Sequence, residues 1–308
     1  MATYGHPEKV SHKNLEEDPV MMEKALAPSE PVVDRFVGQE KSVVNRALLR
    51  KQDFRLIPIC ALMYLLAYLD RSNIGNAKVM NSETNHDLMS ETGLTNDQYA
   101  IALMVFLIAY TIFEVPSNTF LKRVGPAKWF ALLLCCWGAI SMCLGATHDF
   151  AGLTAARFLL GAFEAGLAPG LAYYISFWYR ADERSIRLAF IYSTATLADA
   201  FGGLVAYGIS HLNQAAGLAG WRWLFILEGA PSVLFGVFIF FYLPDFPETA
   251  RFLTTEEKEL AILRMEHNGS KGSAAHMTWA DAKEVLTDWR LYVHYINYFS
   301  KSSRFKRN

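Results

Sequence analysis

Residues 151–179 read AGLTAARFLLGAFEAGLAPGLAYYISFWY, a long block of apolar and small residues that carries two charges, Arg157 and Glu164. A block of this length is sufficient to cross a lipid bilayer as a helix. On insertion scales, each charged residue at the centre of such a helix costs about 2.5–3.5 kcal/mol. Two charges in one span therefore indicate a polar face that is turned toward a cavity.

The spacing of these charges limits their partners. Arg157, Gly161 and Glu164 follow i, i+4, i+7 spacing, so they share one helix face. At about 1.5 Å per residue, the two charges are separated by about 10 Å along the helix axis. This distance is too long for a direct ion pair, and we therefore expect each charge to find its partner on another helix.

The composition is that of a membrane protein. The chain has 308 residues, of which 52% are hydrophobic, and its net charge is −1. The apolar residues come in blocks of about 20 that are separated by short charged links. All four cysteines, Cys60, Cys135, Cys136 and Cys143, lie inside these blocks, so we expect no disulfide or zinc site outside the membrane. The sequence contains no nucleophile elbow, metal-ligand cluster or phosphate loop, and it predicts neither an enzyme nor a cofactor nor a nucleic-acid partner.

Six apolar spans are predicted, and they define the expected fold as an all-α membrane protein. Residues 1–54 are expected to form a cytoplasmic tail that is first disordered and then basic. Residues 55–245 form the six-helix transmembrane bundle. Residues 246–308 form a cytoplasmic segment with short helices, one of them opened by a capping box at Thr254–Glu257, and the start of an incomplete seventh span. The six spans cover about residues 56–77, 99–121, 129–146, 151–179, 188–212 and 221–243.

The charged links predict the orientation of the bundle. Lys and Arg number five, one, three, none, three and none in the successive segments that flank the spans. Cytoplasmic segments carry the excess of positive charge in membrane proteins. We therefore expect the N-terminus and the segment after Leu243 to be cytoplasmic, and the chain to lie in the plasma membrane.

Five motifs carry a family resemblance that covers about residues 40–290. They are LDRSNIGNAK (69–78), FEVPSNTFLKRVGPAKW (113–129), ARFLLGAFEAGLAPG (156–170), GWRWLFILEG (220–229) and LPDFPETARFLTTEEK (243–258). With these motifs the chain resembles the anion:cation symporter family of the major facilitator superfamily, and most closely its fungal branch of nicotinate, pantothenate and allantoate permeases. The resemblance implies a secondary transporter of a small organic anion, driven by protons, whose six helices form the N-terminal half of the fold as inverted three-helix repeats.

The resemblance is to half of a transporter. Full members of the family have twelve spans in two halves, and this chain resembles the first half and the central loop. We expect a truncated product of a longer gene, or else a half-transporter that dimerises. Two alternatives from other classes stay open: a sensor that binds the same ligand without transporting it, and a non-transporting fragment that acts through a partner.

The first and fourth spans carry the candidate site. Asp70, Arg71 and Arg157 are expected at about the same depth, near 10 Å from the extracellular edge, with Glu164 about two turns deeper. The resemblance implies that both spans line the cavity. Our hypothesis is that Arg71 and Arg157 bind the substrate carboxylate and that Asp70 and Glu164 carry the coupled proton. The alternative is a structural ion-pair network.

Three uncharged residues extend this site. Tyr64 and Tyr68 precede Arg71 with i, i+4, i+7 spacing and place two rings on its helix face. They form an aromatic wall for a flat anion, or they pack against neighbouring helices, and the two readings have equal weight. Asn73 is a further candidate for substrate binding.

A gating or structural role is expected for a second group of residues. Glu114 lies two residues before Pro116, which removes a backbone hydrogen bond from the second span. Gly161, Gly166 and Gly170 are expected to permit close contact between helices.

Two more charges are of lower interest. Asp199 precedes Gly202 and Gly203 in the fifth span and is a weaker cavity candidate. Arg222, between two tryptophans at the start of the sixth span, is interpreted as an anchor at the membrane edge.

Overall fold

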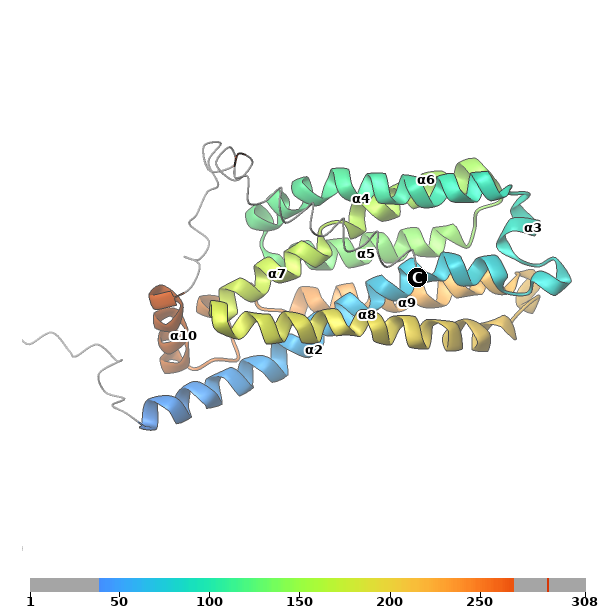
Figure 1. The fold of residues 1–308 in the computed structure, drawn as a ribbon. Helices are drawn as coiled ribbons and strands as arrows, with labels where there is room; N and C mark the ends of the chain where they lie inside the picture. Colours follow the sequence, from blue (N-terminus) through green and yellow to red (C-terminus); the bar gives the residue numbers. More distant parts are fainter. Residues whose placement is uncertain (1–38, 269–286, 288–308) are drawn as a thin grey trace, which may run out of the picture.

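Six of the described helices or helix pairs are long and apolar enough to cross a membrane (Figure 1). The structure is a computed structural model, and it describes residues 39–268 and residue 287. Residues 1–38 of the expected tail and the incomplete seventh span lie outside the described residues. So does a second short helix that the sequence predicts over 279–286. The predicted all-α fold with six spans is confirmed.

The spans follow one another up and down the bundle, and they are joined by short links. The links contain η2 (Ser82–Thr84), α3 (Leu88–Thr92) and η3 (Ala215–Gly217) at one end, and η4 (Pro247–Thr249) and α10 (Thr255–Asn268) at the other. We call these the α3 end and the α10 end. The spanning helices are α2 (Gln39–Val79), α4 (Asn96–Val124), α5 (Pro126–Leu144), α6 (Phe150–Glu164) with α7 (Leu167–Trp178), α8 (Ala181–Ser210) and α9 (Gly220–Tyr242).

The first helix is longer than the predicted first span. It begins at Gln39, well before Leu56, so the basic residues 41–55 belong to the helix rather than to an irregular tail. The cause is local, because this segment contains no glycine or proline that would end a helix. The basic part of the predicted tail is therefore helical.

The sequence predicted the fourth span as one continuous helix, but the structure shows two. It is divided into α6, which ends at Glu164, and α7, which begins at Leu167. Pro169 explains the break, because its ring nitrogen cannot donate a hydrogen bond to the carbonyl of Ala165 and its ring clashes with that carbonyl. The interruption lies directly after the charged residue Glu164.

The helices pair in a reciprocal pattern that relates the two halves of the bundle. The first helix of the first triplet, α2, packs on α8, the second helix of the other triplet. In the same way α6 packs on α4, and the two third helices, α5 and α9, pack on each other. This exchange confirms the predicted inverted three-helix repeats.

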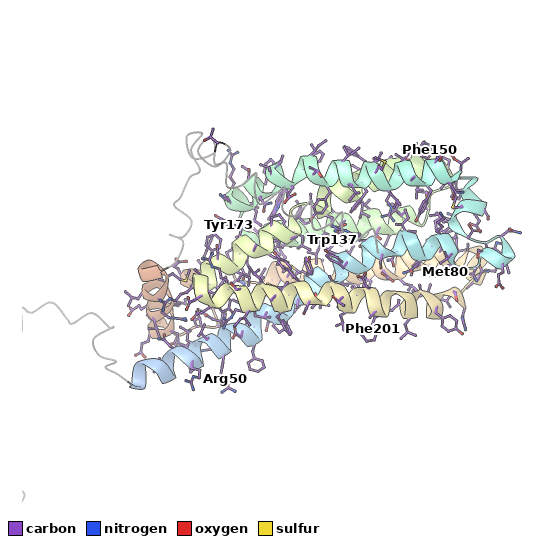
Figure 2. The ribbon with its side chains drawn as sticks, in the orientation of Figure 1. Arg50, Met80, Trp137, Phe150, Tyr173 and Phe201 are labelled. Carbon is purple, nitrogen blue, oxygen red and sulfur yellow. The ribbon has the colours of Figure 1, made fainter. Side chains whose placement is uncertain are left out.

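The α5–α9 contact is close because glycines face each other across it. A Cβ atom on Gly138 would lie 2.7 Å from the carbonyl oxygen of Gly229, and one on Gly229 would lie 2.6 Å from that of Gly138. Figure 2 shows the resulting inside and outside: Trp137 of α5 is fully buried, and Phe201 of α8 is 52% exposed. Exposed apolar side chains are expected where helices face lipid.

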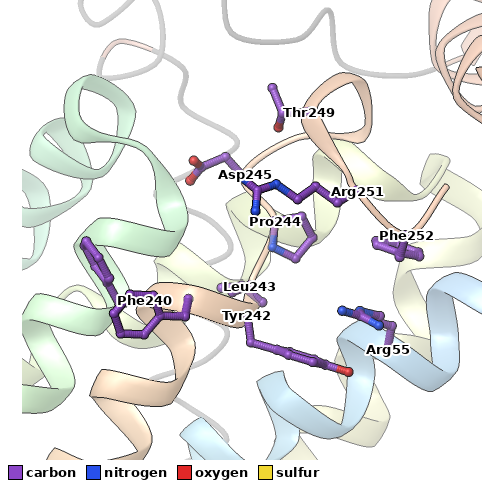
Figure 3. A pocket seen from close by; sticks show the side chains of 10 residues that line it. Arg55, Phe240, Tyr242, Leu243, Pro244, Asp245, Thr249, Arg251 and Phe252 are labelled. Carbon is purple, nitrogen blue, oxygen red and sulfur yellow. The ribbon is translucent and has the colours of Figure 1, made fainter.

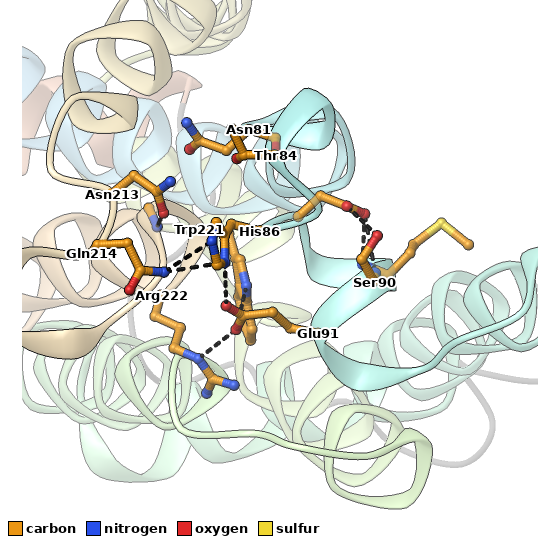
Figure 4. Close-up of polar contacts among 12 residues, drawn as sticks. Asn81, Thr84, His86, Ser90, Glu91, Asn213, Gln214, Trp221 and Arg222 are labelled. Carbon is orange, nitrogen blue, oxygen red and sulfur yellow. Dashed lines mark hydrogen bonds and ion pairs between the residues drawn. The ribbon is translucent and has the colours of Figure 1, made fainter.

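Arg222 is a buried clamp at the α3 end, and its interpretation as an anchor at the membrane edge is wrong (Figure 4). Its Nε donates to Glu91 at 3.2 Å, and its Nη1 donates to the carbonyls of Gly145 and Thr147, both at 2.9 Å. Trp221 also donates to Glu91, at 3.2 Å. The residue ties α9 to the link after α5 and to α3, contacts that the sequence spacing could not reveal.

Replacing Arg222 with Met is expected to lower the free energy of unfolding by about 2 kcal/mol, because two carbonyls lose their donor and the Glu91 carboxylate loses its cationic partner. Thermal unfolding of the purified protein in detergent measures this. The matched control is Lys78→Met at the same end, whose hydrogen bond to Asn96 is exposed and should contribute less than about 1 kcal/mol. Equal losses in the two variants would contradict the clamp.

Ion pairs fasten α10 to the bundle. The predicted capping box is present: Thr254 and Glu257 exchange hydrogen bonds at 2.8 and 3.3 Å. Glu257 also pairs with Lys51 of α2 at 2.6 Å, and Arg264 pairs with Glu183 of α8 at 2.5 Å. Burial raises the pKa of the Glu257 carboxyl, but the hydrogen bonds from Lys51 and Thr254 outweigh it, so the pKa lies below its ordinary value. This contribution to stability is present above the unfolded pKa and is lost as the pH falls through the folded one.

Candidate functional site

An ion pair between Arg71 of α2 and Glu164 of α6 forms the centre of the candidate site. The Arg71 Nη2 atom lies 2.5 Å from the Glu164 Oε1 atom. The Arg71 side chain is 34% exposed, whereas that of Glu164 is 2% exposed. The cation therefore borders open space, and its carboxylate partner lies behind it.

This pair corrects the expected depths of the charged side chains in the membrane. Arg71 was expected at the depth of Asp70 and Arg157, whereas Glu164 was expected about two turns deeper. Side chains lean toward the N-terminus of their own helix. Because α2 and α6 run in opposite directions, Arg71 leans toward the α10 end and Glu164 leans toward the α3 end. The two side chains thus lean toward each other, and their charged ends meet although their backbone positions lie at different depths in the membrane.

Aromatic rings surround the Arg71 guanidinium. Its central carbon lies 5.1 Å from the ring centre of Tyr68, 5.0 Å from that of Tyr110 and 5.5 Å from that of Phe106. Tyr110 and Phe106 belong to α4 and were not predicted. Their i, i+4 spacing, which continues to Glu114, is the signal that could have identified them. The rings hold the cation in place and border the same space.

Tyr64 lies behind Tyr68 rather than beside the cation. It is 8% exposed, its hydroxyl donates to that of Tyr68 at 3.2 Å, and its ring centre lies 5.0 Å from that of Tyr192 on α8. Of the two predicted tyrosines, Tyr68 contacts Arg71 and Tyr64 packs between α2 and α8.

Asp70 and Arg157 lie inside the bundle, away from the exposed side of Arg71. Asp70 is 2% exposed, and its Oδ1 accepts a hydrogen bond from Ser141 of α5 at 2.6 Å. Arg157 is 1% exposed, and its guanidinium carbon lies 5.8 Å from the ring centre of Phe225. Arg157 interacts electrostatically with Asp70 and, more weakly, with Glu164. The positive charge of Arg157 therefore lies near the negative charges of Asp70 and Glu164 inside the bundle.

Asn73 belongs to the same interior layer. It is fully buried and donates a hydrogen bond to Glu228 of α9, which is 9% exposed. Together with Asp70 and Ser141, this contact joins α2 to α5 and α9 by polar groups. Asn73 thus contacts α9, which lies on the side of α2 away from the exposed face of Arg71. Its partner Glu228 belongs to the fourth motif, GWRWLFILEG.

The three glycines of the fourth span bring α4 and α5 close to the Glu164 region. A Cβ atom at Gly161 would lie 2.4 Å from the carbonyl oxygen of Phe106. One at Gly166 would lie 1.8 Å from the Ser117 Oγ atom, and one at Gly170 would lie 2.8 Å from a methyl carbon of Leu121. The break between α6 and α7 therefore packs directly on α4, whose aromatic residues border Arg71.

Two further carboxylates at membrane depth have neither an ion pair nor a hydrogen bond to another described side chain. Glu114 is half-buried on α4, which stays helical through Pro116, and Asp199 is exposed on α8. A carboxylate is not stable against lipid hydrocarbon, so each requires water or further protein at its face. Within residues 39–268, no group of three or more His, Cys, Asp and Glu side chains could hold a metal ion.

Comparison with known proteins places the chain in a family. Residues 60–300 match the family described as Major Facilitator Superfamily. The MFS transporter prlL of a fungal species (strain NRRL 50135) is 56% identical over 260 residues, which cover 84% of this chain and 52% of that protein. The MFS-type transporter cnsO of Penicillium expansum is 39% identical over 269 residues, with 84% and 51% coverage. The chain thus spans about half the length of these curated relatives.

A solved structure agrees with the fold. XylE with a double tryptophan substitution superposes with a TM-score of 0.54 at 18% identity, over 70% of this chain and 52% of that one. A protein of Agrobacterium vitis, whose name refers to tartrate transport, is 34% identical over 273 residues, which cover 87% of this chain and 58% of that protein. The family match, the relatives and the six spans lead to one conclusion: the chain belongs to the Major Facilitator Superfamily and is an integral, multi-pass membrane protein.

Proposed function

We infer that this chain is the N-terminal half of a secondary transporter that takes up a small organic anion together with a proton, as the resemblance to the anion:cation symporter family implies. The observation that carries the proposal is the Arg71–Glu164 pair at membrane depth, with the cation partly exposed and the carboxylate buried. A charge pair in this position is expensive to keep for packing alone.

The geometry supports a coupled exchange. A substrate carboxylate that enters from the exposed side takes the place of Glu164 on the Arg71 guanidinium, which can bind it through two N–H groups. Glu164 then loses its directly paired cation in a buried site and takes up a proton. The charge of the site is the same before and after, because one anion and one proton enter together. Asp70, Arg157 and Asn73 hold the helices in place through the interior network.

The rings around Arg71 favour a flat monocarboxylate such as nicotinate. Tyr68, Tyr110 and Phe106 offer apolar faces next to the cation. The fungal branch that the motifs resemble includes nicotinate permeases. The relative from Agrobacterium vitis, which carries a name that refers to tartrate, is consistent with a carboxylate as substrate.

A second six-helix unit completes the cavity in this proposal. In the isolated chain, Asp199 on α8 is exposed and Arg71 on α2 is partly exposed, although both lie at membrane depth. The helix faces that carry these two side chains require water or polar protein groups, rather than lipid, next to them. The unit comes from a longer chain, as in the relatives of which this chain covers about half, or from a second copy that forms a homodimer.

The α10 end is proposed to be cytoplasmic, in the plasma membrane. Among the described Lys and Arg residues outside the membrane interior, all lie at the α10 end except Lys78 and Arg222. The excess of positive charge marks the cytoplasmic side.

Replacing Glu164 with Gln tests the proton coupling. With the protein in nanodiscs and a weak buffer, nicotinate binding is expected to withdraw about one proton per anion from solution, and a pH indicator measures the change. The Glu164→Gln variant should bind nicotinate without taking up a proton, because an amide has no charge to neutralise. Nicotinamide, which has the same ring without the carboxylate, is the control ligand and should cause no proton uptake. Proton uptake by the variant equal to that of the unmodified protein would rule out Glu164 as the coupling group.

A further inference from the structure

A pocket of about 360 Å³ lies at the α10 end, away from the Arg71–Glu164 site (Figure 3). It forms where α9 ends beside α2 and where the link with η4 folds back over both helices. Figure 3 shows Arg55 of α2 next to Tyr242, with Arg251 and Asp245 of the link above Pro244. Its volume lies in the range of about 300–1,000 Å³ that is usual for small-ligand sites.

The Arg55 guanidinium is held between two rings. Its central carbon lies 4.1 Å from the ring centre of Tyr242 and 5.1 Å from that of Phe252. Its Nε atom is buried without a hydrogen-bond partner, and no carboxylate among the described residues forms an ion pair with it. Since the faces of the guanidinium are covered, its N–H groups remain to donate to an oxyanion in the pocket.

Arg251 supplies a second positive charge to the same pocket. Its side chain is exposed and has no ion pair among the residues that the structure describes. Asp245 also lines the pocket, but its Oδ1 accepts a hydrogen bond from the backbone N–H of Ala127 at 2.8 Å, at the N-terminus of α5. The positive end of that helix offsets much of the Asp245 charge. The pocket is therefore positive overall.

The rim of the pocket lies at the boundary between the apolar span and the polar link. Phe240, Phe241 and Tyr242 are 50%, 81% and 38% exposed at the end of α9, and the span ends at Leu243. Tyrosine is enriched at the membrane–water interface, so Tyr242 marks the level of the lipid headgroups. A molecule in this pocket thus meets the two arginines on one side and apolar rings on the other.

We propose that this pocket binds the phosphate of an anionic phospholipid, with Arg55 and Arg251 as the two cationic contacts. Tyr242 and Phe252 position Arg55, and the acyl chains extend along Phe240 and Phe241 into the bilayer. Basic pockets beside membrane helices are suited to anionic headgroups. The site is separate from the transport site, and it gives the protein a means to respond to the lipid composition of the leaflet at the α10 end.

The test measures the binding of phosphatidylserine to the full chain by native mass spectrometry in a neutral detergent, where no charged membrane surface contributes. The double variant Arg55→Gln/Arg251→Gln is expected to weaken binding by at least about tenfold, because two charge-assisted contacts are lost. The matched control, Arg46→Gln/Arg50→Gln, removes the same charge from the exposed surface of α2 and should change binding by less than about threefold. Phosphatidylcholine should bind at least about tenfold more weakly than phosphatidylserine.

A single variant keeps the test independent of folding. Arg251→Gln changes an exposed residue that has no ion pair among the described residues, so it should leave the fold intact and weaken phosphatidylserine binding by about threefold or more. Equal losses in the pocket and control double variants, or no loss in Arg251→Gln, would overturn the proposal. Displacement of phosphatidylserine by inorganic phosphate at equal concentration would also overturn it, since the pocket would then be a site for free phosphate.

Discussion

Replacement of Arg71 with Gln is expected to lower the affinity for nicotinate by at least about 30-fold, because losing one member of a hydrogen-bonded charge pair costs about 2–5 kcal/mol. Two effects combine in this variant. The substrate carboxylate loses its cation, and the buried Glu164 loses its only hydrogen-bonded partner. Equilibrium dialysis of radiolabelled nicotinate against the protein in nanodiscs measures the affinity.

The conservative variant and a distant arginine provide the controls for this prediction. Arg71→Lys keeps the charge but loses the planar pair of donors, so it should retain part of the affinity. Arg50→Gln removes an exposed charge from the same helix, far from the site, and should leave the affinity unchanged. If Arg71→Gln binds nicotinate as well as the unmodified protein does, Arg71 is not the anion-binding group.

Replacing Gly161 with Leu is expected to destabilise the bundle by more than about 3 kcal/mol, the upper end of ordinary overpacking. A Cβ atom here would lie 2.4 Å from the carbonyl oxygen of Phe106. This obstacle is backbone, so it cannot move without shifting α4 as a whole. The expected result is a large loss of folded protein, measured as the midpoint of thermal unfolding in detergent and as the yield of monodisperse protein.

Gly203→Leu is the matched control, because Gly203 is also a glycine of a membrane helix and a Cβ atom there would meet no atom within 4 Å. Its effect should be less than about 1 kcal/mol, since leucine favours the helix and has free space. Similar destabilisation by the two substitutions would show that helix propensity, and not the contact with α4, determines the role of Gly161.

Several features could be predicted from local sequence because each depends on one segment. The six spans follow from the length of the apolar blocks, and the distribution of Lys and Arg between the two ends follows from the links. The capping box at Thr254–Glu257 needs only four consecutive residues. The break after Glu164 was equally local, since Pro169 was present in the sequence, but the apolar character of the whole stretch concealed it.

The partners of the charged residues could not be predicted in this way. Spacing along one helix identified Arg157 and Glu164 as unable to pair with each other, and it correctly required partners on other helices. It did not identify those partners. Arg222 shows the same limit: its contacts with Glu91, Gly145 and Thr147 come from segments that are more than 70 residues away. Such contacts depend on how the links pack at the end of the bundle.

The apolar blocks and the charges within them are enough to predict a six-span membrane protein with costly charges in its first and fourth spans, because bilayer thickness and the cost of burying charge act on each segment alone. Which of these charges faces open space depends on how the helices pack. Arg71 and Glu164 meet because α2 and α6 are antiparallel and their side chains lean toward each other, whereas Asp70, Arg157 and Asn73 are enclosed by α5 and α9. The relative rotation and direction of packed helices decide this, and no single helix contains that information.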